Sequence, residues 1–139
     1  MSASIESFAP EFRDFLENEG FVISKSLEKP EEFGNTSIIL ESPKLKIRIY
    51  SDRGQRFVDV GSIGQDWHKL EYVLEFVEPA CSQQWFGEPP QLDKLAVALK
   101  RNISAISGLL SGDLATSGFT MFEKKKSNKL IEKIFKKPK

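Results

Sequence analysis

The chain has very few of the side chains that carry catalysis and metal binding. Its 139 residues include one cysteine, Cys81, and one histidine, His68. A single cysteine excludes an intrachain disulfide and is typical of a reducing compartment. Zinc sites usually need several His or Cys ligands, whereas His68 with Glu71 or Glu75 would supply one imidazole and one carboxylate. We therefore expect no metal, no cofactor and no catalytic residue, and a protein that is not an enzyme.

Long apolar runs and targeting signals are also missing. No stretch approaches the roughly 20 apolar residues that a membrane span needs, so we expect no transmembrane segment. The acidic N-terminus lacks the basic and apolar regions of a signal peptide. The glycines of residues 61–64 lack the lysine and hydroxyl spacing of a phosphate-binding loop. These absences favour a cytoplasmic protein without a nucleotide site.

Charge of neither sign is in excess, but charge is unevenly distributed along the chain. Basic and acidic side chains number 20 each. Residues 1–42 hold 9 acidic and 3 basic side chains, whereas residues 121–139 hold 2 acidic side chains and 8 lysines. A neutral chain with an acidic head and a basic tail is not typical of a general nucleic-acid binder. We expect no specific nucleic acid as its partner.

Aromatic and apolar side chains are plentiful, and they occur at regular spacing. Eleven phenylalanines predict a core built on aromatic packing. Phe8, Phe12, Phe15 and Leu16 fall at helical spacing, and Gly20 after them predicts a left-handed C-terminal residue. We expect one N-terminal helix whose phenylalanines lie on a sheet.

The stretch 45–61 predicts a β-hairpin. Apolar and polar residues alternate over residues 45–50, a polar turn follows, and apolar residues return at 57–60. A loop of only Arg53-Gly54 gives a register that joins apolar to apolar and opposite charges to each other. The competing register, with Gly54 as a bulge residue, is poorer because it pairs Ile47 with Asp59. The favoured pairs are Ile49 with Val58, Ile47 with Val60, and Arg48 with Asp59.

The remaining segments predict an α+β protein. Residues 21–27 and 36–42 are typical of strands, and the spacing predicts a helix that Asp66 caps and a long helix over 92–110. We expect a four-stranded antiparallel meander with an N-terminal helix and two or three C-terminal helices packed mainly on one face. The chain is of a size for a single α+β domain, residues 1–139, whose residues 124–139 form a lysine-rich helix that is either packed on the rest or loosely attached.

Three features bear on binding, and each has a plainer interpretation. The charged hairpin is either a solvated sheet face with cross-strand ion pairs or a patch that faces a partner. Aromatics in the Gly- and Pro-rich segment 80–91 are either core plugs or interface anchors. The lysine-rich end is either an ordinary amphipathic helix or a contact for anionic membrane or RNA. The candidate partner-binding residues are Arg48, Asp52, Arg53, Arg56, Asp59, Trp85 and Phe86.

Part of the chain resembles a group of small bacterial proteins. The likeness covers about residues 15–75 and rests on Gly20-Phe21-Val22, Phe33-Gly34, residues 45–49, residues 52–55 and residues 67–70. Some of those proteins resemble the immunity proteins of contact-dependent and other polymorphic toxin systems. The resemblance implies an α+β cytoplasmic protein that binds one cognate toxin domain and blocks its active site or substrate groove.

Three hypotheses about function follow. The leading one is a non-enzymatic protein-binding domain of immunity type, whose charges speed association and whose aromatics slow release. The second is a peripheral adaptor that docks to anionic membrane or RNA through its lysine-rich C-terminus. The third is a small enzyme with an unrecognised site, to be sought in a deep pocket near His68 or Cys81.

Overall fold

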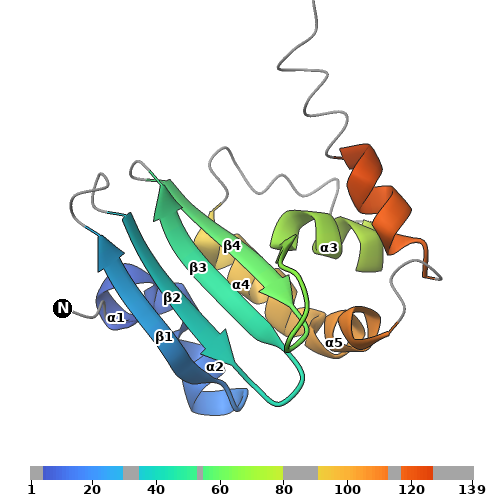
Figure 1. Cartoon of the computed structure of the whole chain (residues 1–139). Coiled ribbons are helices and arrows are strands. Elements are labelled where there is room, and N and C mark those ends of the chain that lie inside the picture. Colours follow the sequence, from blue (N-terminus) through green and yellow to red (C-terminus); the bar gives the residue numbers. More distant parts are fainter. Residues whose placement is uncertain (1–4, 30–34, 53–54, 80–90, 113–116, 127–139) are drawn as a thin grey trace, which may run out of the picture.

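A computed structural model describes residues 5–29, 35–52, 55–79, 91–112 and 117–126. Short helices precede a run of strands, and longer helices follow it (Figure 1). Residues 119–126 form a further helix at the end of the described chain, called helix 119–126 below. The elements are α1 (Ile5–Phe8), η1 (Pro10–Phe12), α2 (Arg13–Asn18), β1 (Val22–Lys29), β2 (Asn35–Glu41), β3 (Lys46–Asp52), β4 (Gln55–Gly61), β5 (His68–Lys69), α3 (Leu70–Val77), α4 (Leu92–Arg101) and α5 (Ile103–Ser111).

The strands form an antiparallel sheet in the order β1-β2-β3-β4-β5, so the α+β class with an antiparallel meander is confirmed. The favoured hairpin register is also confirmed, because Ile47, Arg48 and Ile49 pair with Val60, Asp59 and Val58. The predicted number of four strands is wrong. The fifth strand is the two-residue β5, which pairs with β4 at Asp59 and Val60.

The alternation of side chains gives the sheet two unlike faces. Ile38, Leu40, Ile47, Ile49 and Val58 are almost completely buried and belong to the hydrophobic core. Helices α1, α2 and α4 lie behind this core-facing side in Figure 1, and the viewer looks onto the other side, called the open face below. The core therefore fixes which residues of β3 and β4 the open face presents.

The N-terminal segment is three short helical pieces where one helix is predicted. Ala9 leaves the helical region and is fully buried, and Pro10, which has no N–H, begins the turn η1. The phenylalanine stripe is as predicted, since Phe12 and Phe15 are buried and their rings stack 5.3 Å apart. Gly20 has the predicted left-handed backbone, with φ of 77°.

The helices after the sheet also differ in detail from the prediction. Helix α3 begins at Leu70, not after Asp66, because the chain first forms β5. The predicted long helix is broken into α4 and α5 at Asn102, whose φ and ψ are −110° and 15°. Both its backbone N–H and its side-chain amide donate to the Ala98 carbonyl, so Asn102 caps the end of α4.

Helix 119–126 docks beside α3 through aromatic rings. The fully buried Phe119 lies 5.3 Å from the ring of Phe76 and 5.3 Å from that of His68. Lys126 adds an ion pair of 2.8 Å to Glu75 of α3. This docking brings helix 119–126 next to the β5 edge of the sheet.

Candidate functional site

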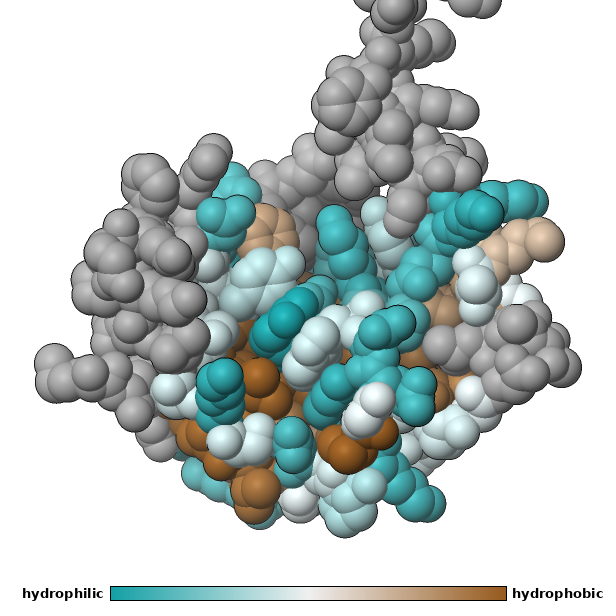
Figure 2. Space-filling view, in the orientation of Figure 1, coloured by the Kyte–Doolittle hydropathy of each residue, from teal (hydrophilic) through white to brown (hydrophobic). Residues whose placement is uncertain are grey.

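The open face concentrates cationic and aromatic side chains on β3 and β4. Lys46, Arg48 and Tyr50 alternate with the buried residues of β3, and Phe57 and Asp59 do the same on β4. The rings of Tyr50 and Phe57 stack across the strands with centroids 5.4 Å apart. Polar and apolar residues are interspersed across this face in Figure 2, without one continuous apolar patch.

Arg48 and Asp59 form the ion pair at the centre of the open face. The Arg48 Nη2 donates to the Asp59 Oδ2 at 2.5 Å, and the Asp59 residue is only 6% exposed. The Arg48 Nε is buried and has no acceptor among the described residues. Asp59 thus fixes the Arg48 guanidinium while about a third of the Arg48 side chain, 34%, stays exposed.

Trp67 lies over Lys46 and Arg48 on the open face, and it is a site residue that the sequence patterns do not indicate. The Lys46 Nζ lies 4.3 Å from the Trp67 ring centroid, and the Arg48 Cζ lies 4.6 Å from it. Gly61 permits this arrangement, because a Cβ at that position would lie 2.5 Å from the Asp66 carbonyl oxygen. The helix that the sequence predicts after Asp66 would include Trp67, and no local signal places Trp67 over β3.

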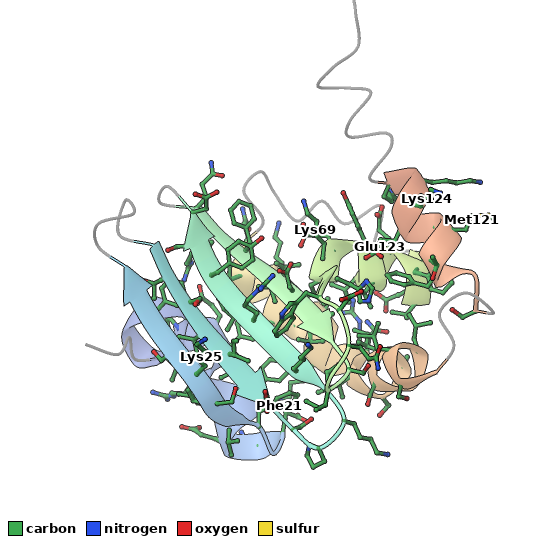
Figure 3. The ribbon with its side chains drawn as sticks, viewed as in Figure 1. Phe21, Lys25, Lys69, Met121, Glu123 and Lys124 are labelled. Atoms are coloured by element: carbon green, nitrogen blue, oxygen red, sulfur yellow. The ribbon has the colours of Figure 1, made fainter. Side chains whose placement is uncertain are left out.

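A hollow of about 490 Å³ opens between the sheet and helix 119–126, and we call it the Trp67 hollow. Its walls come from β3, β4, β5, α3 and helix 119–126. Figure 3 labels Lys69, Glu123 and Lys124 at this end of the molecule, whereas Phe21 and Lys25 lie toward β1. The lining residues are Arg48, Tyr50, Asp59, Trp67, Lys69, Tyr72, Thr120, Glu123 and Lys124.

Burial changes the proton affinity of three groups around the Trp67 hollow. Loss of hydration raises the pKa of Tyr50 and the pKa of Tyr72, so both phenols stay neutral donors at neutral pH. Burial also raises the pKa of Glu71 above its ordinary value of 4.5, although its own backbone N–H and Lys69 oppose the shift. Hydrogen-bond donors, cations and aromatic walls therefore meet at one site, which suits recognition of a polar group.

The structure separates the predicted binding residues into three groups. Arg48 and Asp59 lie together at the centre of the open face, and Asp52 is exposed at the end of β3. Arg56 points to the helix-covered side, where its guanidinium binds the Glu11 carboxylate at 3.0 and 3.2 Å and the Phe8 carbonyl at 3.0 Å. The remaining candidates, Arg53, Trp85 and Phe86, lie outside the described residues.

His68 contacts a carboxylate and a buried aromatic ring, and these contacts are typical of a residue that stabilises packing. Its Nδ1 lies 2.6 Å from the Glu123 Oε2, its side chain is 10% exposed, and its ring packs edge-on against Phe119. A hollow of about 780 Å³ beside it is lined by hydroxyls such as those of Ser62 and Thr120. No hydrogen bond joins a hydroxyl to the His68 ring among the described residues. Cys81 lies outside them.

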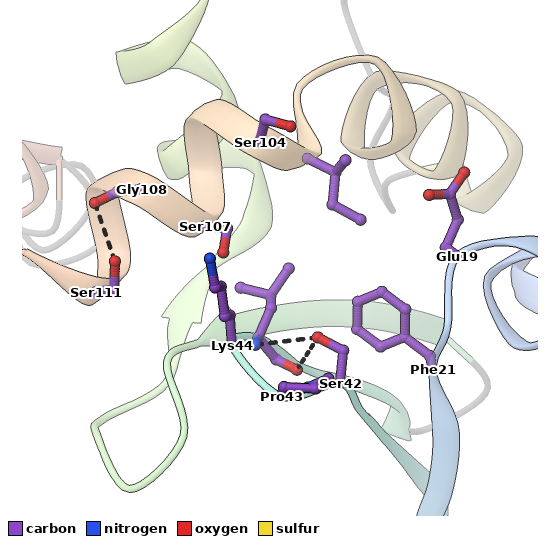
Figure 4. Close-up of a pocket in the computed structure, with 11 residues that line it drawn as sticks. Glu19, Phe21, Ser42, Pro43, Lys44, Ser104, Ser107, Gly108 and Ser111 are labelled. Carbon is purple, nitrogen blue, oxygen red and sulfur yellow. Dashed lines mark hydrogen bonds between the residues drawn. The ribbon is translucent and has the colours of Figure 1, made fainter.

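A further hollow, of about 520 Å³, lies between α5 and the turn that joins β2 to β3 (Figure 4). Ser104, Ser107 and Ser111 line its α5 side, and Phe21 and Lys44 line the other. The Ser111 hydroxyl donates to the Gly108 carbonyl within its own helix. This hollow lacks the convergent charges and rings that distinguish the Trp67 hollow.

Comparisons with known proteins give no information about the function of this chain. No protein-family model, no curated protein and no solved structure matches the chain. In the described ranges, no three His, Cys, Asp or Glu side chains gather closely enough to hold a metal ion. None of the described helices has the length and apolar character to cross a membrane.

Proposed function

We propose that the chain is a non-enzymatic protein-binding domain of immunity type, which acts in the cytoplasm by binding a cognate toxin domain. The observation that supports this proposal is the open face, where an arginine, a tryptophan and stacked aromatics are held together without a covering helix in the described structure. Arginine, tyrosine and tryptophan are the residues that most often dominate the binding energy of protein interfaces.

The open face is organised for binding before a partner arrives. Arg48 is held by Asp59 on one side and by the rings of Trp67 and Tyr50 on the other, at 4.6 and 5.3 Å. Side chains that are already ordered lose little conformational entropy on association, so more of the contact energy appears as affinity. The exposed charges of Asp52 and Lys69 at the ends of the face would steer the encounter.

In this proposal the domain inhibits by occupation. Trp67 and the Tyr50–Phe57 stack would supply the apolar contacts that slow dissociation, and Arg48 would supply a directed hydrogen bond. Trp85 and Phe86 would add anchors from the segment outside the described residues. A toxin domain covered in this way loses access to its substrate, and the bound domain needs no chemistry of its own.

Co-purification with the product of the neighbouring gene tests the proposal. We expect a stable complex, and we expect Trp67→Ala to weaken it by about 2 kcal/mol, roughly thirtyfold in Kd. Val97→Ala is the matched control, because Val97 is an exposed apolar residue, 63% accessible, on α4 at the helical side of the molecule. Failure to form any complex, or equal affinity of the two variants, would contradict the proposal.

A further inference from the structure

We infer that the Trp67 hollow receives an acidic side chain of the protein partner. This inference rests on the proposed function and specifies the chemistry of the partner's contacting surface. It is carried by the placement of Lys69 and Lys124 on two separate elements around the hollow, next to Arg48 and Trp67.

The charges that line the hollow do not cancel locally. Both lining carboxylates are already engaged, Asp59 with Arg48 at 2.5 Å and Glu123 with His68 at 2.6 Å. Lys69 and Lys124 are both exposed, and neither has a carboxylate within ion-pair distance among the described residues. Three cationic side chains, Arg48, Lys69 and Lys124, line the hollow together with the two carboxylates, so its lining carries a net positive charge.

The shape and composition of the hollow strengthen an ion pair formed inside it. Trp67, Tyr50 and Tyr72 give it apolar walls. Ion pairs between such walls are less screened by water than pairs on an open surface. A volume of about 490 Å³ accommodates a glutamate or aspartate side chain with part of its flanking backbone.

The same contacts favour an acidic protein segment over a nucleic acid. Single-stranded nucleic acids bind by stacking bases on free aromatic faces. The Trp67 ring is instead approached by Lys46 and Arg48, and the Tyr50 ring is stacked on Phe57.

Titration of the full chain with defined oligomers, followed by amide and indole NMR signals, tests the inference. The probes are acetylated hexaglutamate, hexaglutamine and a thymidine hexanucleotide. We expect saturable shifts of the Trp67 indole and the Lys69 and Lys124 amides with hexaglutamate only. Lys69→Glu/Lys124→Glu should weaken this binding by roughly tenfold or more. The dispersion of its spectrum reports whether the double variant is folded.

Lys25→Glu/Lys44→Glu is the matched control, since it makes the same charge change at two exposed lysines outside the Trp67 hollow. It should bind hexaglutamate like the parent chain. Equal shifts with hexaglutamine, tighter binding of the hexanucleotide, or equal loss in the control variant would overturn the inference.

If a complex with the neighbouring gene's product forms and its affinity is unchanged by Lys69→Glu/Lys124→Glu, the inference fails and the proposed function stands. If hexaglutamate binds as expected and no complex forms, the proposed function fails and acid recognition stands.

Discussion

At the scale of single residues, the burial of the Asp59 carboxylate depends on its ion pair with Arg48. A buried carboxylate is stable only when it is paired, and Arg48 supplies the partner. Asp59→Asn removes the charge at nearly constant volume and should lower the free energy of unfolding by about 1–3 kcal/mol. Urea denaturation measures this change. Asp52→Asn, at an exposed position of the neighbouring strand, should stay within about 0.5 kcal/mol. Equal effects of the two variants would show that the Asp59 pair adds no stability.

Glu71 provides a prediction about pH. Burial raises its pKa in the folded state above the ordinary value of 4.5, so the folded chain holds this proton more tightly than the unfolded chain. The resulting stabilisation is complete below about pH 4.5 and is lost as the pH rises through the folded-state pKa. Glu71→Gln stays neutral, so it should unfold at higher urea than the parent at pH 7, and the difference should shrink toward pH 4. A difference that is constant with pH would contradict this.

The side of the sheet on which Arg56 lies could be predicted from the sequence, whereas its ion-pair partner could not. Arg56, Val58 and Val60 alternate, so strand periodicity alone places Arg56 on the core-facing side and Asp59 on the other. That signal was available, although the partner of Arg56, Glu11, is 45 residues away and has no local signature. The contact of Trp67 with Lys46 and Arg48 likewise depends on tertiary structure alone.

At the scale of elements, the turn after β4 positions Trp67. The chain passes so close to Gly61 that a Cβ there would overlap the Asp66 carbonyl at 2.5 Å. Gly61→Ala should therefore lower the free energy of unfolding by about 1–3 kcal/mol and displace Trp67. Urea denaturation and the Trp67 indole NMR signal would report both effects. Gly108→Ala makes the same change inside α5, where nothing lies within 4 Å, and should add about 0.5–1 kcal/mol. The prediction is wrong if both alanines stabilise.

Helix 119–126 depends on one buried ring for its docking. Phe119 is fully buried against Phe76 and His68, so Phe119→Ala should cost about 3 kcal/mol or expose this helix locally. In either case the amides of residues 119–126 should exchange hydrogen faster than they do in the parent chain. Met121→Ala, on the same helix and 67% exposed, is the control and should leave exchange unchanged. Unchanged exchange in Phe119→Ala would refute the docking role.

The elements that the sequence predicted well are those with long periodic signals. Apolar and polar residues alternate over residues 45–50, and this alternation together with the apolar residues at 57–60 was enough to predict the register of β3 and β4. The two residues of β5 are too few to show any period, and β5 forms only because the turn returns the chain to β4. The apolar spacing of residues 92–110 continues across Asn102, so periodicity could not reveal the break between α4 and α5.

At the scale of the whole molecule, the uneven charge of the chain is used within the fold. The acidic head is tied to later elements by Glu11 with Arg56 and by Asp14 with Lys100. Among the basic residues near the C-terminus, Lys126 pairs with Glu75 of α3. Glu11, Asp14 and Lys126 therefore connect the head and the tail to the body of the molecule. Arg56 and Arg48 lie on opposite sides of the sheet, Arg56 on the helix-covered side and Arg48 on the open face.

Those two arginines allow stability and recognition to be tested separately. Arg56→Gln and Arg48→Gln each remove one guanidinium from one carboxylate, on opposite sides of the same hairpin. Both should lower the free energy of unfolding, by about 1–3 kcal/mol, because each leaves a carboxylate without its partner. Only Arg48→Gln should also raise the Kd for the co-purified partner, by roughly tenfold, measured by calorimetry where both variants are folded. If Arg56→Gln weakens the complex equally, binding reports general stability and the open face is not the interface.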